Sequence, residues 1–227
     1  MSLSLNFSNQ SKESLLIVLN AFEKLQLKSQ YELGRWKILN CAVTLYASKK
    51  LLIQGSGAEQ VKELILSKLK LDDFLILGID ETGRGENFGI LVVVGILGCS
   101  KDFLELRDSK KIQKIEEKKK IVEQKAKHIF VRIFSPGEID SLRLQGINLN
   151  QMEAQAMDSI IQEAQKTNLD FKIKIDGNPL PLKSKNVEFI VKGDDLEPVI
   201  GAASVLAKFV RDTSLNNEKR KTWKSKL

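Results

Sequence analysis

Two near-continuous apolar runs, at residues 74–79 and 90–97, constrain the fold of this chain more than any other feature. An apolar run of this length, without alternation, is typical of a strand that is covered on both faces of its sheet. Later segments alternate between the two periodicities: helical patterns at 111–127, at 150–166 and from about 196 past 211, and strand patterns at 129–134, 171–175 and 187–191. Strands that alternate with helices predict an α/β domain.

The first seventy residues follow a different pattern. Apolar residues at helical spacing predict an amphipathic helix at 12–27. Short strand-like runs and a second helical stretch come next, at 35–39, 42–47, 51–54 and 58–70. The polar Leu71-Asp72-Asp73 then breaks the pattern. We therefore expect a small N-terminal α+β domain at 1–72 and a larger α/β domain at 73–227.

The charge balance favours a polyanionic partner. Lys and Arg number 36 against 29 Asp and Glu, a formal net charge of +7. Nucleic acid and an anionic membrane surface both suit such a chain. A lysine-rich solvated surface accounts for the charge equally well.

Cysteine usage and hydropathy suggest where the protein works. Cys41 and Cys99 stand far apart in apolar contexts, so neither a disulfide framework nor a thiolate metal site is indicated. No signal-peptide pattern opens the chain, and the longest apolar stretch, at 89–98, is too short to span a bilayer. We expect a cytoplasmic protein without a membrane partner.

Acidic residues stand where apolar strands end. Asp80 and Glu81 follow the first strand, Asp176 closes another, and Asp194 follows a third. Carboxylates from separate strand ends suit an open site for a hard cation such as Mg²⁺ or Mn²⁺, and without a cation their clustering is repulsive. The alternatives are a solvated Asp-Glu pair and an ordinary helix cap made by Asp194 or Asp195.

A glycine loop at 82–89 follows the first acids. It lacks the Gly-Lys of a P-loop, and Phe88 stands where the dinucleotide motif needs a third glycine. Backbone amides around Gly83 and Gly85 are suited to grip a sugar hydroxyl or a phosphate, with Arg84 supplying charge. An ordinary tight turn is the alternative.

His128 is the only histidine, which limits the catalytic chemistry open to the chain. A Ser-His-Asp triad would have to use it, and a zinc motif with two histidines is excluded. It stands at the start of a predicted strand, where a structural or surface role is expected.

Four segments, in order and at matching spacing, resemble the type 2 ribonucleases H. They are GIDETGRGENFG at 78–89, LRDSKK at 106–111, KIDGN at 174–178 and VKGDDLEPVIGAASVLAKFVRD at 191–212. The resemblance covers most of the chain after residue 74. It implies a ribonuclease H-like catalytic domain at 73–227 whose metal ions, Mg²⁺ or Mn²⁺, are held by Asp80, Glu81, Asp176 and Asp194.

The same resemblance implies residues that bind substrate. Gly83, Arg84 and Gly85 resemble the element that recognises the ribonucleotide 2′-hydroxyl, a contact that distinguishes RNA from DNA. Ser109 and Lys110 match the family's Asp-Ser-Lys and would lie by the phosphate backbone.

The N-terminal domain points to one branch of the family. VTLYASKKLLIQG at 43–55 resembles the extra domain of ribonuclease HIII, which is similar to the TATA-binding protein fold and holds the hybrid. The Gly-Arg-Gly is typical of ribonuclease HII, whereas the Asn-Phe-Gly that follows is more similar to ribonuclease HIII.

The last residues depart from the family pattern. The family continues beyond the Arg-Asp motif, and the HII branch uses a tyrosine there to sense the RNA-DNA junction. Here the last residues are KTWKSKL, and Tyr31 and Tyr46 lie elsewhere, so we expect a domain that is short at its C-terminus and poor cleavage at a single embedded ribonucleotide. The basic tail is either a phosphate contact or a solvated helix end. It comprises Lys219, Arg220, Lys221, Lys224 and Lys226.

Together these features imply a monomeric endoribonuclease that hydrolyses the RNA strand of RNA/DNA hybrids. The resemblance implies a two-metal-ion mechanism that leaves 3′-hydroxyl and 5′-phosphate ends and requires no histidine. Two alternatives stay open: a hybrid-binding protein or truncated form without turnover, and a nucleotide-dependent phosphotransferase. The missing P-loop lysine argues against the phosphotransferase.

Overall fold

The computed structural model describes residues 2–7, 12–69, 74–106, 114–214 and 218–223. Contacts divide the chain into two compact units. The first comprises Met1–Asp73 and Leu104–Gln113, and the second Phe74–Phe103 and Lys114–Leu227. The sequence placed Leu104 in the larger domain, but its side chain is buried in the hydrophobic core of the first unit.

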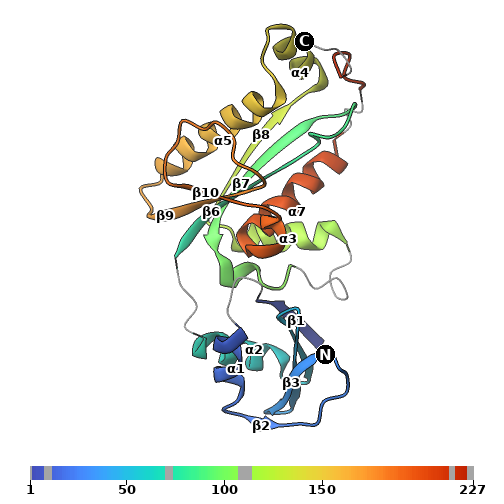
Figure 1. The fold of residues 1–227 in the computed structure, drawn as a ribbon, viewed down its shortest axis with the longest axis vertical. Coiled ribbons are helices and arrows are strands. Elements are labelled where there is room, and N and C mark those ends of the chain that lie inside the picture. The colour runs from blue at the N-terminus through green and yellow to red at the C-terminus, as the bar shows by residue number, and fades with distance from the viewer. Residues whose placement is uncertain (1, 8–11, 70–73, 107–113, 215–217, 224–227) are drawn as a thin grey trace. The chain divides into compact units, whose positions relative to one another are not determined.

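The first unit contains a five-stranded antiparallel sheet with the order β1-β5-β4-β3-β2 and two helices (Figure 1). Its elements are β1 (Ser2–Asn6), α1 (Lys12–Leu19), β2 (Glu23–Lys24), β3 (Glu32–Ile38), β4 (Cys41–Tyr46), β5 (Lys50–Gly55) and α2 (Ala58–Lys68). Leu15 of α1 and Ile65 of α2 share one core with Val43 and Ile53 of the strands. Burial alternates along β3, so the helices cover one face of the sheet and leave the other face open.

Two features of the first unit differ from the sequence prediction. The helix predicted at 12–27 ends at Leu19, because Glu23 and Lys24 pair with β3 and form the edge strand β2. Strand β1 was not predicted, although Leu3 and Leu5 alternate with serines as a strand requires. In both cases pairing with a distant strand decides the local structure.

The second unit contains a mixed five-stranded sheet with the order β10-β9-β6-β7-β8, in which β6, β9 and β10 are parallel. Strands β7 and β8 complete it in antiparallel fashion. Its elements are β6 (Leu75–Thr82), β7 (Leu91–Cys99), a 3₁₀ turn (Ser100–Phe103), α3 (Ile115–Lys125), β8 (His128–Phe134), α4 (Pro136–Leu144), α5 (Leu149–Gln165), β9 (Phe171–Asp176), β10 (Val187–Ile190), α6 (Gly193–Leu196) and α7 (Pro198–Asp212).

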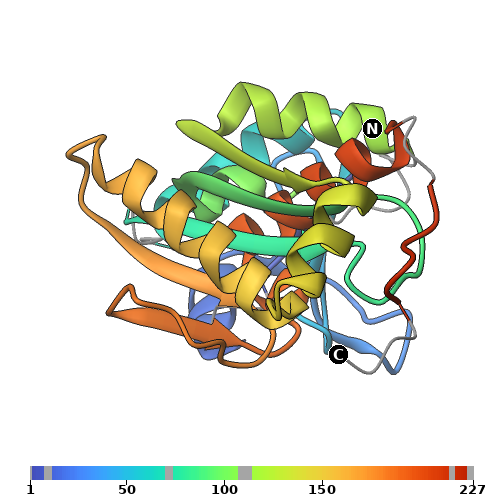
Figure 2. The same ribbon diagram turned by 90° about the horizontal axis from the view of Figure 1, so that it is seen from above.

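Helices cover both faces of this second sheet. Helix α5 crosses one face, where Met157 and Ile160 pack with Leu77 and other strand residues (Figure 2). Helix α7 lies on the other face so closely that a Cβ at Gly78 would stand 2.7 Å from the backbone nitrogen of Ile200. Double coverage is what the continuous apolar runs predicted.

Helix α4 was not predicted, and the last helix begins later than expected. Ser135 and Glu138 form a reciprocal capping box at the start of α4, with Pro136 in its first turn. The helix expected from about residue 196 begins at Pro198, after the separate short helix α6.

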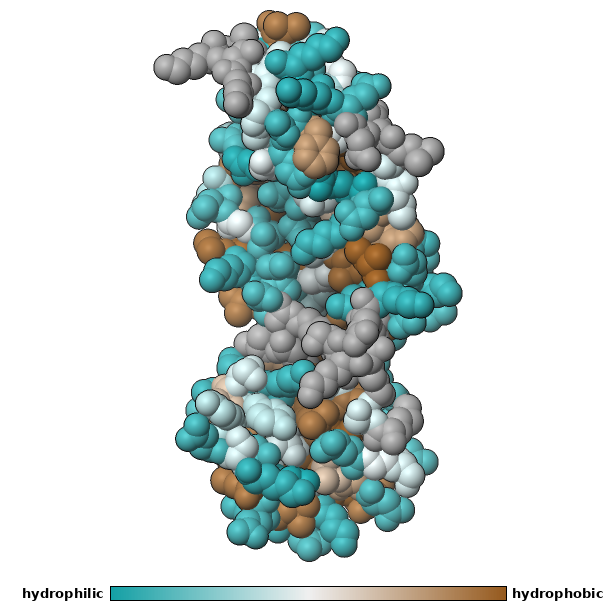
Figure 3. All heavy atoms as spheres, turned by 90° about the vertical axis from the view of Figure 1, so that its right-hand side faces the viewer, coloured by the Kyte–Doolittle hydropathy of each residue, from teal (hydrophilic) through white to brown (hydrophobic). Residues whose placement is uncertain are grey.

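Apolar side chains gather inside each unit. The face seen in Figure 3 is mostly hydrophilic, with hydrophobic residues in small groups. None of the helices in the described part of the chain combines the length and the apolar character that a membrane crossing requires.

Candidate active site

Asp80 and Glu81 lie within β6, whose pairing with β7 continues to Thr82. The expectation that both residues follow the strand end was therefore wrong. Because successive side chains of a strand point to opposite faces, Asp80 faces α7 and Glu81 faces α5. Asp80 is hydrogen-bonded to the Ser204 side chain of α7, and Glu81 is repelled electrostatically by Glu153 of α5.

Asp176 lies beside Asp80 because their strands are parallel neighbours. The register pairs Ile175 with Ile79, so the next residue of each strand is an aspartate: Asp176 at the carboxyl end of β9 and Asp80 within β6. Asp176 interacts electrostatically with both Asp80 and Glu81. The sheet itself thus brings three of the four predicted acids together.

Asp194 reaches the same edge through its backbone. Asp176 Oδ1 accepts hydrogen bonds from the amides of Gly193, at 2.5 Å, and of Asp194, at 3.4 Å. Lys192 adopts a left-handed conformation, with φ of 58°, and turns the chain from β10 into α6. The four acids therefore come from two parallel strands and from the first turn of a short helix.

Neither Asp194 nor Asp195 caps helix α7, which was the alternative role considered for them. Its N-cap is Glu197, whose carboxylate accepts from the Val199 amide and also binds Lys174 Nζ at 2.7 Å. Asp194 and Asp195 lie within α6, one turn earlier.

The chemistry of these carboxylates fits a hard divalent cation. Burial, followed by repulsion from neighbouring carboxylates, raises the pKa of Asp80 to about 7 and that of Glu81 to about 7. A divalent cation would relieve that repulsion and favour the ionised forms. Within the described ranges, no group of three or more His, Cys, Asp or Glu side chains is arranged so that it could hold a metal ion as it stands.

The glycine loop begins directly after β6. Gly83 has φ of +90°, and a Cβ there would stand 2.3 Å from the carbonyl oxygen of Ile90, so the backbone requires glycine. Gly85 has no atom within 4 Å of a Cβ position, which leaves its backbone open to an approaching ligand. Arg84 projects between them with a half-exposed side chain.

Two arginines support the far side of this loop. Arg211 of α7 forms an ion pair with Glu86, and its guanidinium lies over the Phe88 ring at 5.6 Å from the ring centre. Arg220 is 1% exposed and donates hydrogen bonds to the carbonyl oxygens of Glu86, at 2.8 Å, and Gly89, at 3.0 Å. Arg220 is thus bound to the loop and is not a phosphate contact or part of a solvated helix end.

The other candidate residues from the sequence lie away from these acids or outside the residues that the structure describes. Ser109, Lys110, Lys224 and Lys226 fall outside the described residues. His128 is exposed at the start of β8, and its ring stacks on Phe130 at 6.1 Å.

Sequence reasoning missed Glu153, which is fully buried in α5. Burial raises its pKa to about 7, whereas Arg84 acts to lower it. The sequence does carry a signal, because Glu153 occupies the apolar stripe that continues through Met157, Ile160 and Ala164. A charged residue in such a stripe needs a charged partner or a function.

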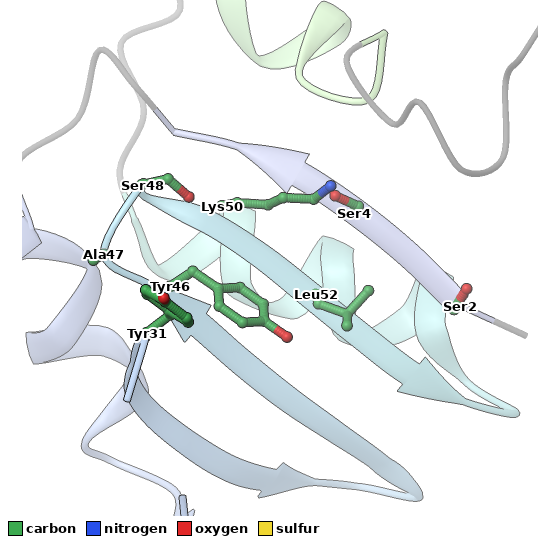
Figure 4. A pocket seen from close by; sticks show the side chains of 8 residues that line it. All are labelled: Ser2, Ser4, Tyr31, Tyr46, Ala47, Ser48, Lys50 and Leu52. Carbon is green, nitrogen blue, oxygen red and sulfur yellow. The ribbon is translucent and has the colours of Figure 1, made fainter. Parts of the chain in front are cut away.

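A second candidate surface lies on the open face of the first sheet. A pocket of ≈ 580 Å³ there has aromatic, hydroxyl and ammonium groups along β1, β4 and β5 (Figure 4). It is lined by Ser2, Ser4, Tyr31, Tyr46, Ala47, Ser48, Lys50 and Leu52.

Comparison with known proteins identifies the family. A family model described as Ribonuclease HII matches residues 77–226, nearly the whole second unit. The chain belongs to the ribonuclease HII family. Ribonuclease HII of Hydrogenovibrio crunogenus is 36% identical over 150 residues, which are 63% of this chain and 67% of that protein. Ribonuclease HII of Francisella philomiragia is 40% identical over 141 residues, 61% of this chain and 72% of that protein. Membership of this ribonuclease HII family makes the chain a ribonuclease H enzyme.

Solved structures confirm the expected fold class across both units. The Q54A mutant of Bst-RNase HIII has a TM-score of 0.56 and 18% identity, and covers 93% of this chain and 80% of its own. Aquifex aeolicus RNase H3 has a TM-score of 0.51 and 22% identity, and covers 95% of this chain and 85% of its own. RNase HII from Archaeoglobus fulgidus, solved with PCNA, has a TM-score of 0.51 and 25% identity, and covers 61% of this chain and 73% of its own. The fold is thus ribonuclease H-like, preceded by the extra N-terminal α+β unit that the ribonuclease HIII resemblance implied.

Proposed function

We propose that the chain is an endonuclease that hydrolyses the RNA strand of RNA/DNA hybrids with the help of Mg²⁺ or Mn²⁺. The observation that carries this proposal is the position of Asp176, at the carboxyl end of β9, beside Asp80 of the parallel strand β6. Gly85, whose backbone is open to a ligand, follows the end of β6 by three residues. Membership of the ribonuclease HII family supports the reaction class, and Bst-RNase HIII has been crystallised with Mn²⁺.

Asp80, Glu81, Asp176 and Asp194 would hold the metal ions. When bound, two such ions would supply an activated water and stabilise the leaving oxygen. The family resemblance assigns 3′-hydroxyl and 5′-phosphate ends to the products. The protein orients its carboxylates beforehand: the Ser204 hydroxyl hydrogen-bonds Asp80, and the Gly193 and Asp194 amides bind Asp176. Such support fixes ligand orientation in metal sites generally.

Recognition of RNA is assigned to the glycine loop. The backbone amides from Gly83 to Gly85 suit hydrogen bonding to a ribose 2′-hydroxyl, since no side chain obstructs Gly85. Arg84 supplies positive charge for a neighbouring phosphate. Ser109 and Lys110 are proposed as additional phosphate contacts on the strength of the family resemblance.

The first unit is proposed to hold the hybrid on its open sheet face. Lys50 carries a charge that suits a phosphate, and the hydroxyl of the half-buried Tyr46 can donate to a sugar or phosphate oxygen. Contacts of this kind give affinity without base specificity.

The direct test is cleavage of a labelled RNA/DNA hybrid with Mg²⁺ or Mn²⁺, with duplex DNA as the comparison substrate. We expect cutting of the hybrid alone, abolished by Asp80→Asn, and product ends that DNA ligase and phosphatase assays identify as 3′-hydroxyl and 5′-phosphate. Tight hybrid binding without cutting under either metal would overturn the proposal and leave a hybrid-binding protein.

A further inference from the structure

Two residues of α5 hold the side chain of Arg84. Its Nη2 group donates a hydrogen bond to Asn150 Oδ1, and its Nη1 lies 3.3 Å from Glu153 Oε2. Asn150 and Glu153 are three residues apart, so they share one face of the helix. The loop arginine is thus tied to a rigid element that also packs against the sheet.

The carboxylate of Glu153 destabilises the fold if its role is purely structural. Its side chain is 0% exposed, and neither carboxylate oxygen has a hydrogen-bond partner. A buried carboxylate without hydrogen bonds destabilises a fold unless an opposite charge stands close. The guanidinium of Arg84 is the positive charge that the structure places against it.

Arg84 keeps binding capacity after both contacts are made. Its side chain is 45% exposed, and a guanidinium carries five N–H donors in a planar fork that matches phosphate geometry. Its contacts with Asn150 and Glu153 do not use all five of these donors. A side chain fixed in this way loses little conformational entropy when it binds an anion.

We propose that Glu153 is a positioning residue that holds Arg84 of the glycine loop in the orientation that binds a phosphate of the hybrid. The inference rests on the proposed function, because it assigns the specific partner of Arg84. Glu153 acts through Arg84 and does not itself touch the substrate. Asn150 serves the same purpose from one turn earlier on the helix.

The test is a double-mutant cycle with Glu153→Gln, Arg84→Ala and the double variant, measured as kcat and KM for hybrid cleavage in Mg²⁺. Glutamine preserves the shape of the side chain and removes its charge. We expect Glu153→Gln to raise KM by about fivefold to tenfold, a loss typical of a charge-assisted contact. We expect kcat to change by less than about twofold. In the Arg84→Ala background the same change should have no further effect on KM, because no guanidinium is left to orient.

Glu163→Gln is the matched control. Glu163 lies on the same helix and is paired with Arg132, but half of its side chain is exposed. The substitution removes the same charge and should leave both kinetic parameters unchanged. Asn150→Ala provides a second variant, at an exposed position that tolerates truncation. It should raise KM when Arg84 is present and have no effect on KM in the Arg84→Ala background.

Other outcomes would overturn the inference. Additive effects of Glu153→Gln and Arg84→Ala would show that Glu153 does not act through the arginine. A fall in kcat together with a higher Mg²⁺ requirement would place Glu153 among the metal-binding acids. If the unmodified chain does not cut hybrid, the proposed function fails, and the same cycle measured as hybrid Kd in Ca²⁺ still decides the role of Glu153.

Discussion

The two sheets of this chain differ in how they are covered, and the difference decides where each can bind a ligand. The first sheet is wholly antiparallel and has helices on one face only, so polar side chains occupy its open face. In the second, parallel strands run from one edge to the centre, and helices cover both faces. A sheet without an open face can expose functional groups only where its strands end, as it does at Asp176.

The comparison also separates two kinds of contact with nucleic acid. An open sheet face offers many weak, exposed groups that bind a backbone without regard to sequence. A strand end between two covering helices offers a few buried acids whose ionisation depends on their surroundings. Binding and chemistry should therefore be separable by mutation. Changes at Asp176 and Lys50 test this separation, and changes at Arg220 and Asp158 test the layers that cover the second unit.

The largest effect is expected at the strand end. Asp176→Asn should lower kcat for hybrid cleavage by on the order of a hundredfold or more, since it removes a carboxylate from the reacting site. Hybrid affinity should change by less than about threefold, because exposed cations supply it. Asp170→Asn, an exposed change just before the same strand, is the control and should leave cleavage intact. Equal losses of affinity and turnover for Asp176→Asn would break the separation.

Arg220→Ala tests whether residues 218–223 stabilise the second unit by binding its glycine loop. The change leaves two loop carbonyls without their buried donor and should lower the free energy of unfolding by about 2–3 kcal/mol. Urea denaturation of the purified chain measures the difference. Lys219→Ala, one position earlier and exposed, should cost less than about 0.5 kcal/mol. A small effect at Arg220 would mean that the loop is stable without this support.

Asp158 tests the stability of helix α5, which covers one face of the second sheet. Although burial acts to raise its pKa, hydrogen bonds from the amides of Lys183 and Ser184 and from the Ser184 hydroxyl hold that pKa below its ordinary value. A group with a depressed pKa in the folded state stabilises the protein above its unfolded pKa, about 4, and that stability is lost as pH falls. Asp158→Ala should therefore cost about 1–2 kcal/mol near neutral pH and progressively less in acid. Urea titrations at several pH values check this, and a loss that does not shrink in acid would contradict it.

The smallest effect is expected on the open face of the first sheet. Lys50→Ala should weaken hybrid binding by about twofold to fivefold and reduce the salt dependence of log Kd by about 1, as expected for one lost phosphate contact. The value of kcat should not change. Lys68→Ala in the last turn of α2 is the control, because that helix covers the opposite face. An unchanged salt dependence for Lys50→Ala would remove this face from the binding surface.

Much of the architecture could be predicted from sequence because burial pattern and element type agree. The continuous runs of β6 and β7 indicated a doubly covered sheet, and helices lie on both faces. Errors arose where a distant partner overrides the local pattern, as at Glu23, which pairs with β3 although the helical spacing continues. The capping box at Ser135 was visible in the sequence and would have revealed α4.

The sequence indicated that acids stand near strand ends, but not the direction in which their side chains point. Strand ends identified Asp176, whereas the opposite orientations of Asp80 and Glu81 depend on β6 remaining paired beyond them. Glu153 could be recognised only as a charge in an apolar stripe, and its partner Arg84 lies 69 positions earlier in the chain. No local pattern reports a contact over that separation.

The attachment of residues 218–220 to the glycine loop has a consequence for how the protein is made. Phe88 forms an isolated β-bridge with Lys219, and Gly89 accepts a hydrogen bond from Arg220, 131 positions later. A chain emerging from the ribosome folds from its N-terminal end, so the strands that flank this loop are synthesised long before the residues that brace it. The element proposed to recognise RNA is therefore among the last parts of the molecule to reach its final form, because Arg220 can brace it only after this residue has left the ribosome.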